Sequence, residues 1–329
     1  MSKVSVGADF VYWFKRENVF GTASASDVTE IATEGFVINH DYKAHAVPRA
    51  TGYRVQNDSD SWQDTVGSIP ETSFGFLATP DTAMLFPAVL QTDVDYAASN
   101  LVSMSANVDC ADLPDFSADE GYFYTIQAES SCAQSYNERL VSAVGNSLKL
   151  SIGPDSNEGA LFAELGVIAK ESTINAANAT GTNVVPSMST LFKWDSIDTF
   201  TVGGTNYLAS FYEMEATITN AAKPVPNGGG SNIALPKFEG SGSFKIAGND
   251  SNILTLVNSC GSSIPGTAKE LILQWGDGTV SEAGELNIQM DIQLNNYSID
   301  NSEEITYTFE FTMTQKTVGA TPFKLDVWV

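Results

Sequence analysis

Basic residues are scarce in this sequence. Its 16 lysines and arginines stand against 40 aspartates and glutamates, which gives a formal net charge of −24. Proteins that hold nucleic acid or anionic membrane surfaces use clustered lysine and arginine to neutralise phosphates. The deficit therefore argues against a phosphate-gripping role and against a membrane partner. An acidic surface can still lie beside nucleic acid without holding it.

Cysteine and histidine are also rare. The three cysteines, Cys110, Cys132 and Cys260, show no CxxC spacing, and their odd number leaves at least one outside any disulfide. This pattern predicts free thiols in a chain that folds in a reducing cytoplasm. The two histidines, His40 and His45, are five positions apart, so on a strand they face opposite sides and predict no shared metal site.

Long apolar runs are missing as well. No run approaches the length that spans a membrane. The apolar residues 10–14 are followed at once by Lys15 and Arg16, which is not the pattern of a secretory signal peptide. We therefore expect a protein that is not inserted in a membrane and that folds where it is made.

Motifs for catalysis or metal binding are weak. Residues 57–60 resemble part of a calcium loop but lack the glycine and the distal glutamate of an EF-hand. The glycine-rich stretches 228–230 and 276–278 lack the Lys-Ser/Thr of a phosphate loop and predict turns. Calcium binding or paired acid chemistry stays open for one aperiodic acidic segment, residues 107–120, although its composition is typical of a loop. Its acids are Asp109, Asp112, Asp115, Asp119 and Glu120. We expect no catalytic residue, cofactor or metal.

What the sequence does contain is strand-like alternation, most clearly in residues 199–247. Two runs there place apolar and polar side chains on opposite faces with a period of two. The apolar positions are Tyr212, Met214, Ala216 and Ile218 in the first run and Gly240, Gly242, Phe244 and Ile246 in the second. The connector, residues 223–232, is polar and rich in glycine and proline, so it predicts a loop. This stretch predicts a long hairpin suited to pairing with another chain.

Length and composition favour two mainly β domains. Further strands are expected at residues 36–46, 73–78, 122–128, 147–152, 161–168 and 271–275, and a second hairpin from residues 286–294 and 305–313, turning around 296–302. Short helices are expected after Thr79 and Asp250 as N-caps, with Pro87 ending or kinking the first. Residues 171–189 are the best linker candidate, and residues 21–34 predict a loop or an arm.

The two halves repeat one order of elements. Each has a strand, a long polar connector, an apolar residue before proline, a strand, an aspartate and a short helix. These are residues 69–70, 74–78 and Asp81 in the first half, and residues 235–236, 244–248 and Asp250 in the second. A period well above a hundred residues indicates duplicated domains rather than a solenoid. Duplicated β domains with exposed strand edges favour self-assembly into rings.

Several stretches resemble a known family. Residues 17–22 (ENVFGT) are similar to a short N-terminal motif of phage tail tube (major tail) proteins of the duplicated-domain type. Residues 145–152 with 161–166 resemble the end of that family's first domain, and residues 194–220 resemble the start of its second. The resemblance covers most of the chain and marks a fold rather than an active site.

The resemblance implies two similar β-sandwich or β-barrel tail-tube domains, each with a long hairpin and a short helix. Residues 1–185 would form the first domain with an N-terminal arm, and residues 186–329 the second. Three chains would form a pseudo-hexameric ring, and rings would stack, with other tail proteins, into the hollow virion tail. DNA would pass through without specific binding, and assembly would take place in the host cytoplasm. Residues 107–120 have no place in this pattern and predict an external insertion.

Two sets of residues are candidates for these roles. Inter-subunit contacts are predicted for Lys223, Pro224, Asn227, Gly228, Gly229, Gly230 and Asn232. A lumen-facing position is predicted for Glu213, Glu215, Lys237, Glu239 and Lys245. Carboxylates lining a bore would repel the phosphates of passing DNA. The main alternative is a two-domain β-sandwich adhesin or capsid-decoration protein, and the third is an enzyme acting on polysaccharide.

Overall fold

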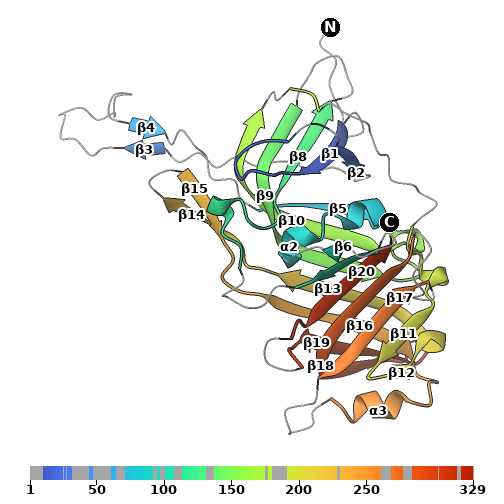
Figure 1. The fold of residues 1–329 in the computed structure, drawn as a ribbon. Coiled ribbons are helices and arrows are strands. Elements are labelled where there is room, and N and C mark those ends of the chain that lie inside the picture. Colours follow the sequence, from blue (N-terminus) through green and yellow to red (C-terminus); the bar gives the residue numbers. More distant parts are fainter. Residues whose placement is uncertain are drawn as a thin grey trace, which may run out of the picture.

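The computed structural model describes residues 10–24, 26, 28–31, 44–46, 61–63, 71–91, 95–96, 101–106, 113–130, 137–174, 177–179, 191–227, 230–260, 268–276, 284–302, 304–316 and 320–328. Strands dominate, as Figure 1 shows. The strand pairs between described residues are antiparallel. The expectation of a mainly β chain is confirmed.

The elements of the first half are β1 (Phe10–Arg16), β2 (Thr29–Ile31), β3 (Ala44–Ala46), β4 (Ser61–Gln63), β5 (Thr72–Leu77), α1 (Pro80–Ala83), α2 (Pro87–Leu90), β6 (Asp95–Tyr96), β7 (Leu101–Ser105), β8 (Tyr124–Ser130), β9 (Asn137–Ile152) and β10 (Phe162–Ile174). Those of the second half are β11 (Thr199–Val202), β12 (Thr205–Asn206), β13 (Phe211–Thr219), β14 (Lys223–Asn227), β15 (Gly230–Ala234), β16 (Glu239–Ala247), α3 (Ile253–Val257), β17 (Lys269–Trp275), β18 (Leu286–Asp300), β19 (Thr306–Met313) and β20 (Phe323–Trp328). Short 3₁₀ turns lie at Phe116–Ala118, Asn157–Gly159, Trp194–Ser196 and Leu208–Ser210.

The predicted central hairpin is β13 paired with β16. Met214, Ala216 and Ile218 are buried, and Met214 lies opposite Phe244. Tyr212 departs from the predicted apolar face because the β13–β16 register shifts between Phe211 and Glu213. This bulge puts Phe211 into the core and leaves Tyr212 half-buried, where its hydroxyl donates to Glu304.

Strand β9 connects the two halves of the chain. Its first part pairs with β8 and its second part with β13, while β10 runs along its other side. Sequence alternation predicted only the last part of this strand, residues 147–152, and only the first part of β10. Because β9 changes partners along its length, one hydrogen-bonded sheet passes from the first half into the second.

Strand β18 is used in a similar way. Leu286–Ile292 pair with β17, and on the other side β18 pairs first with β20 and then with β19. Strand β20 also pairs with β7 of the first half, which makes a second hydrogen-bonded connection between the halves. The strand order is β2-β1-β8-β9-β10-β5 in the first half and β12-β11-β17-β18-β19-β16-β13 in the second.

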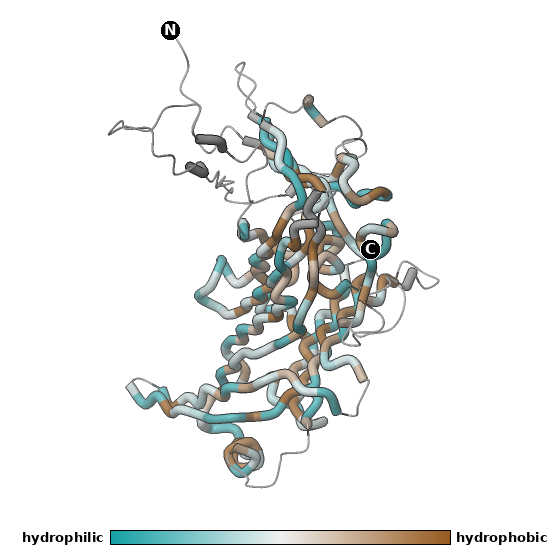
Figure 2. The backbone as a smooth tube through the Cα atoms, turned by 90° about the vertical axis from the view of Figure 1, so that its left-hand side faces the viewer, coloured by the Kyte–Doolittle hydropathy of each residue, from teal (hydrophilic) through white to brown (hydrophobic). Residues whose placement is uncertain are grey.

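The main hydrophobic core also runs through both halves. One cluster of buried side chains extends in sequence from Tyr12 to Val327 and includes Leu150, Ala216 and Phe309. Along the strands, apolar residues alternate with polar ones, as Figure 2 shows. The two halves therefore share packing as well as strand pairing.

The helices are short and only partly as predicted. Thr79 caps α1 in a capping box with Thr82, and Pro80 begins the helix, as predicted. Pro87 not only follows the end of α1 but starts a second helix, α2. In α3 the predicted cap was wrong: the helix begins at Ile253 after Asn252, and Leu254 on this helix is 66% exposed.

Three connector predictions need correction. The predicted linker, residues 171–189, begins inside β10, which continues to Ile174. The second hairpin turns later than predicted, because β18 continues to Asp300. In the acidic segment, Phe116 is buried rather than part of an external loop. Residues 36–43 of a predicted strand and the predicted domain boundary at 185 lie outside the described residues.

Candidate assembly surfaces

The predicted lumen-facing residues lie on one polar sheet face. Glu213 and Glu215 alternate with buried residues on β13, and Lys245 lies opposite Glu213 on β16 with its Nζ 3.9 Å from the carboxylate. Nζ of Lys149 on β9 lies 2.9 Å from a carboxylate oxygen of Glu215. Lys237, which precedes β16, forms an ion pair with Glu239, the first residue of that strand. The structure therefore brings the five predicted residues to one surface, with Lys149 as an addition from the first half.

These ion pairs are exposed and contribute little to stability. Both side chains of the Lys149–Glu215 pair keep more than a third of their surface in water, and exposed pairs typically contribute about 0–1 kcal/mol. Their consequence is electrostatic, because each lysine offsets one carboxylate. By strand register, the same face also carries Glu164, Asp300 and Glu310, so its carboxylates outnumber its lysines.

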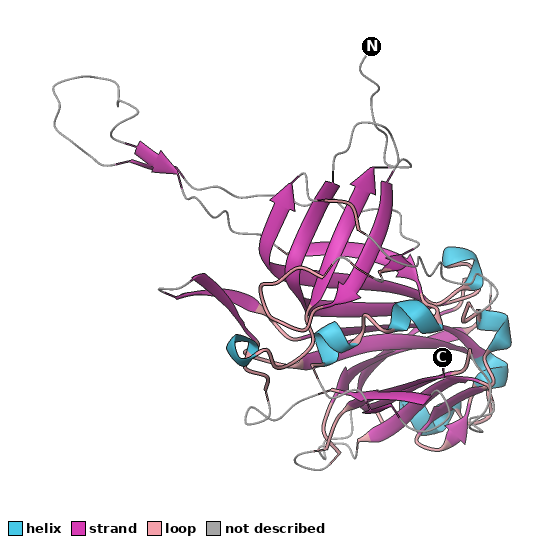
Figure 3. Cartoon of the chain, turned by 45° about the horizontal axis from the view of Figure 1, so that its top comes forward, coloured by secondary structure: helices cyan, strands magenta, loops and turns pink. Residues whose placement is uncertain are grey.

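The predicted inter-subunit loop is a strand ribbon instead. Lys223, Pro224 and Asn227 lie on β14, and Gly230 and Asn232 lie on β15, paired from Lys223–Ala234 to Asn227–Gly230. Gly228 and Gly229 lie outside the described residues. Prolines at alternate positions of β14 share one edge, so a two-stranded ribbon accommodates them on its unpaired side. The ribbon projects from the body on the same side as β3 and β4, as Figure 3 shows.

The base of this ribbon packs on the first half. Ala222 and Ile233 are buried in a second hydrophobic cluster with Phe116, Phe123, Val144 and Ile168, and Phe20 and Leu235 pack against it. The cluster lies away from the main core and combines residues more than a hundred positions apart. Burial of Ala222 and Ile233 therefore fixes the base of the ribbon, and with it the direction in which the ribbon projects.

The stretch with the ENVFGT sequence closes over the same region. Glu17 is 2% exposed, and its carboxylate accepts hydrogen bonds from Thr125 Oγ1 at 2.6 Å, Ser142 N at 2.8 Å and Ser142 Oγ at 2.5 Å. Gly21 adopts φ +87°, a conformation that favours glycine, and its N–H donates to Ser142 Oγ at 2.6 Å. Phe20 stacks on Phe116 with 5.4 Å between ring centroids. These residues form a structural clamp.

Burial governs the ionisation of Glu17. Loss of solvent raises the pKa of this carboxyl above its usual range, although the hydrogen bonds from Ser142 and Thr125 and the charge of Lys170 act in the opposite direction. Glu17 is therefore a buried, hydrogen-bonded acid whose charged form lacks the solvation that it would have in water.

The tip of the second hairpin is an open edge that the sequence prediction treated as a turn. Beyond Ile292, the side of β18 opposite β19 has no strand partner in the described part of the chain. Ile299 is 53% and Ile305 is 54% exposed, beside half-buried Tyr297. The alternation of Tyr297 and Ile299 was the available signal, hidden by the polar residues around them.

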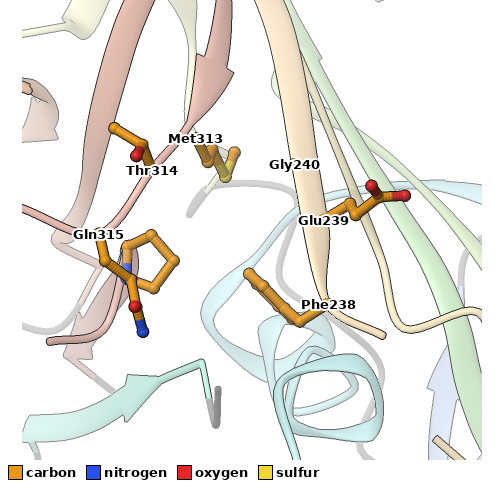
Figure 4. Close-up of a pocket in the computed structure, with 7 residues that line it drawn as sticks. Phe238, Glu239, Gly240, Met313, Thr314 and Gln315 are labelled. Carbon is orange, nitrogen blue, oxygen red and sulfur yellow. The ribbon is translucent and has the colours of Figure 1, made fainter. Parts of the chain in front are cut away.

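Two cavities border the polar face. One, of about 260 Å³, is lined by Phe238, Glu239, Gly240, Met313, Thr314, Gln315 and Pro322 (Figure 4). The other, of about 280 Å³, is lined by Pro154, Asp155, Tyr212, Glu213, Lys245, Asp300, Ser302, Glu304 and Thr306. Both mix polar with apolar groups, and their linings contain neither a cysteine nor a histidine. They offer no pairing of a strong nucleophile with an imidazole base.

Of the remaining candidate residues, those that the structure describes make local structural contacts. Asp115 caps a 3₁₀ turn through Ser117, and Asp119 accepts from the N–H of Phe20. In the described ranges no group of three or more His, Cys, Asp or Glu side chains is placed to hold a metal ion. His45 lies in β3, while His40, residues 57–60, Asp109 and Asp112 lie outside the described residues.

Within the described segments, no helix is long and apolar enough to cross a bilayer. The chain matches no model of a known protein family and no curated protein.

Proposed function

We propose that this chain is a structural, self-assembling protein: the tail tube subunit of a tailed phage, which forms stacked rings around a bore that DNA passes through. The observation that carries the proposal is the correspondence between the halves. In order along the sheet, β1, β8, β9, β10 and β5 of the first half match β11, β17, β18, β19 and β16 of the second. A chain of duplicated β units that join edge to edge is suited to building a ring.

The correspondence extends to single residues. Phe74 lies opposite Leu165 between β5 and β10, and Phe244 lies opposite Phe309 between β16 and β19. The next strand contacts also match: Ala78 N donates to Leu161 O at 2.8 Å, and Gly248 N donates to Ile305 O at 2.6 Å. Under this alignment, residues 74–78 correspond to residues 244–248, which supports the proposal.

A bulge recurs at the same place in both units. Asn146 is the extra residue where the β9–β10 register shifts, and Asn295 is the extra residue where the β18–β19 register shifts. Each lies three positions after the last residue that pairs with the preceding strand, Ala143 or Ile292. A bulge bends a strand, so β9 and β18 bend at equivalent positions.

The polar face of β13 and β16 is assigned to the bore. Glu213, Glu215, Glu239, Lys237 and Lys245 would face passing DNA. Paired lysines lower the local negative charge, but the excess of carboxylates on this face and the net charge of −24 disfavour adhesion of phosphates. The ribbon of β14 and β15, which stands out from the sheets, is assigned to contacts between rings.

Negative-stain electron microscopy of the purified protein tests the proposal. Stacked rings or tubes with an open bore are the expected result. Particles that stay monomeric at high protein concentration would contradict it. A basic bore in a reconstruction of the assembly would contradict the assignment of the polar face.

A further inference from the structure

The open edge of β18 has a partnered counterpart within the same chain. By the register of the two repeats, Leu148 and Leu150 of β9 correspond to Tyr297 and Ile299 of β18, and Leu161 corresponds to Ile305. The three first-half residues are fully buried, at 0% exposure. Ile299 and Ile305 are more than half exposed. Equivalent positions thus differ in whether a further strand lies beside them.

Beside β9 of the first half, that further strand is β13 of the second half. Leu148 lies opposite Ile218, Leu150 opposite Ala216 and Ile152 opposite Met214. The ladder ends where Asn220 N donates to the carbonyl oxygen of the bulge residue Asn146 at 2.8 Å. Because backbone groups alternate in direction along a strand, those of Leu148 and Leu150 are also directed towards β13.

Resting on the proposed function, we infer that the edge of β18 from Asn295 to Asp300 binds the first half of a second copy of this chain. An incoming antiparallel strand uses the register that β13 uses on β9. The backbone groups of Tyr297 and Ile299 bond to it, and its apolar side chains cover Ile299. The carbonyl of Asn295 accepts the bond that corresponds to the one from Asn220.

The junction between the two halves within one chain indicates why the strand that binds the β18 edge should come from the first half of the second copy. The edge of the first unit is completed by the second unit, so repetition of the same junction requires a first unit after each second one. Such a head-to-tail contact closes into a ring or continues as a filament. An exposed apolar strand edge is otherwise an aggregation hazard. Strand addition supplies main-chain hydrogen bonds, and side-chain pockets give it specificity.

Two lysine substitutions on β18 test this inference. Ile299→Lys places a charge on the face that the partner covers, at a position exposed in the single chain. Ser298→Lys is the matched control, because Ser298 corresponds to Lys149, which β9 carries beside β13. Ile299→Lys is expected to raise the protein concentration needed for ring formation by at least about tenfold, since burying an unpaired charge is costly. Ser298→Lys is expected to leave that concentration unchanged. Light scattering and circular dichroism measure assembly and folding.

Each outcome separates the inference from the proposed function. If the unmodified chain forms rings and Ile299→Lys forms them equally well, the edge assignment is overturned while the proposed function stands. A closed two-fold dimer through paired β18 edges overturns the head-to-tail arrangement. Failure of the unmodified chain to associate at all overturns both.

Hydrogen exchange of the unmodified chain gives a second measurement that does not depend on how a variant folds. The amides of Tyr297 and Ile299 are expected to be protected in assembled protein and to exchange rapidly in dilute single chains. Rapid exchange in both states would overturn the inference.

Discussion

At the scale of single residues, Glu17 shows why the N-terminal motif has its composition. One carboxylate accepts bonds from Thr125 and Ser142, and Ser142 in turn accepts the N–H of Gly21. Gly21 supplies the left-handed turn and Phe20 the ring that packs on Phe116. The motif is therefore explained by local closure of the loop onto β8 and β9.

Replacing Glu17 with glutamine is predicted to alter the pH dependence of stability. Burial raises the pKa of Glu17 in the folded state, so its contribution is full below the ordinary carboxyl pKa and is lost as pH rises through the folded pKa. The unfolding free energy of the unmodified chain minus that of E17Q should therefore be smaller at about pH 8 than at about pH 5. Urea unfolding at both values measures it, and a difference that grows with pH would refute the prediction.

At the scale of elements, the β14–β15 ribbon allows the proposed assembly to be tested separately from folding. Its base is buried in the second cluster, whereas its tip extends away from the sheets. Deleting residues 227–230 is predicted to leave the folded chain and single rings intact, because the buried residues Ala222 and Ile233 at the base of the ribbon remain, and to reduce stacking of rings. Negative-stain images of the variant beside the unmodified chain measure this effect. Tubes of normal length would show that the ribbon makes no axial contact.

At the scale of the whole molecule, the halves are predicted to unfold together. The β9–β13 and β20–β7 ladders and one core cluster connect them, so opening one half removes partners from the other. Calorimetry of dilute protein should give a single transition with a ratio of calorimetric to van't Hoff enthalpy of about 1. Two separate transitions would indicate that the halves are independent domains.

The features that could be predicted from the sequence are those set by residues close together in the chain. The alternation of β13 and β16 and the cap at Thr79 and Pro80 depend on side-chain spacing within short windows. Local preference also led to error where it was overridden. Prolines and glycines at 223–232 favour a loop, yet pairing made β14 and β15 strands.

The surfaces that we propose for assembly depend on contacts between distant residues. The strand beside Leu150 comes from the other half of the chain, and Ile299 has no such neighbour among the described residues. Ile233 packs near Phe123, more than a hundred positions away in the sequence. Burial of an apolar residue is decided by what covers it, and a strand edge is open or closed according to the next strand. Neither property is encoded in a short window, so both became visible only when the chain was folded.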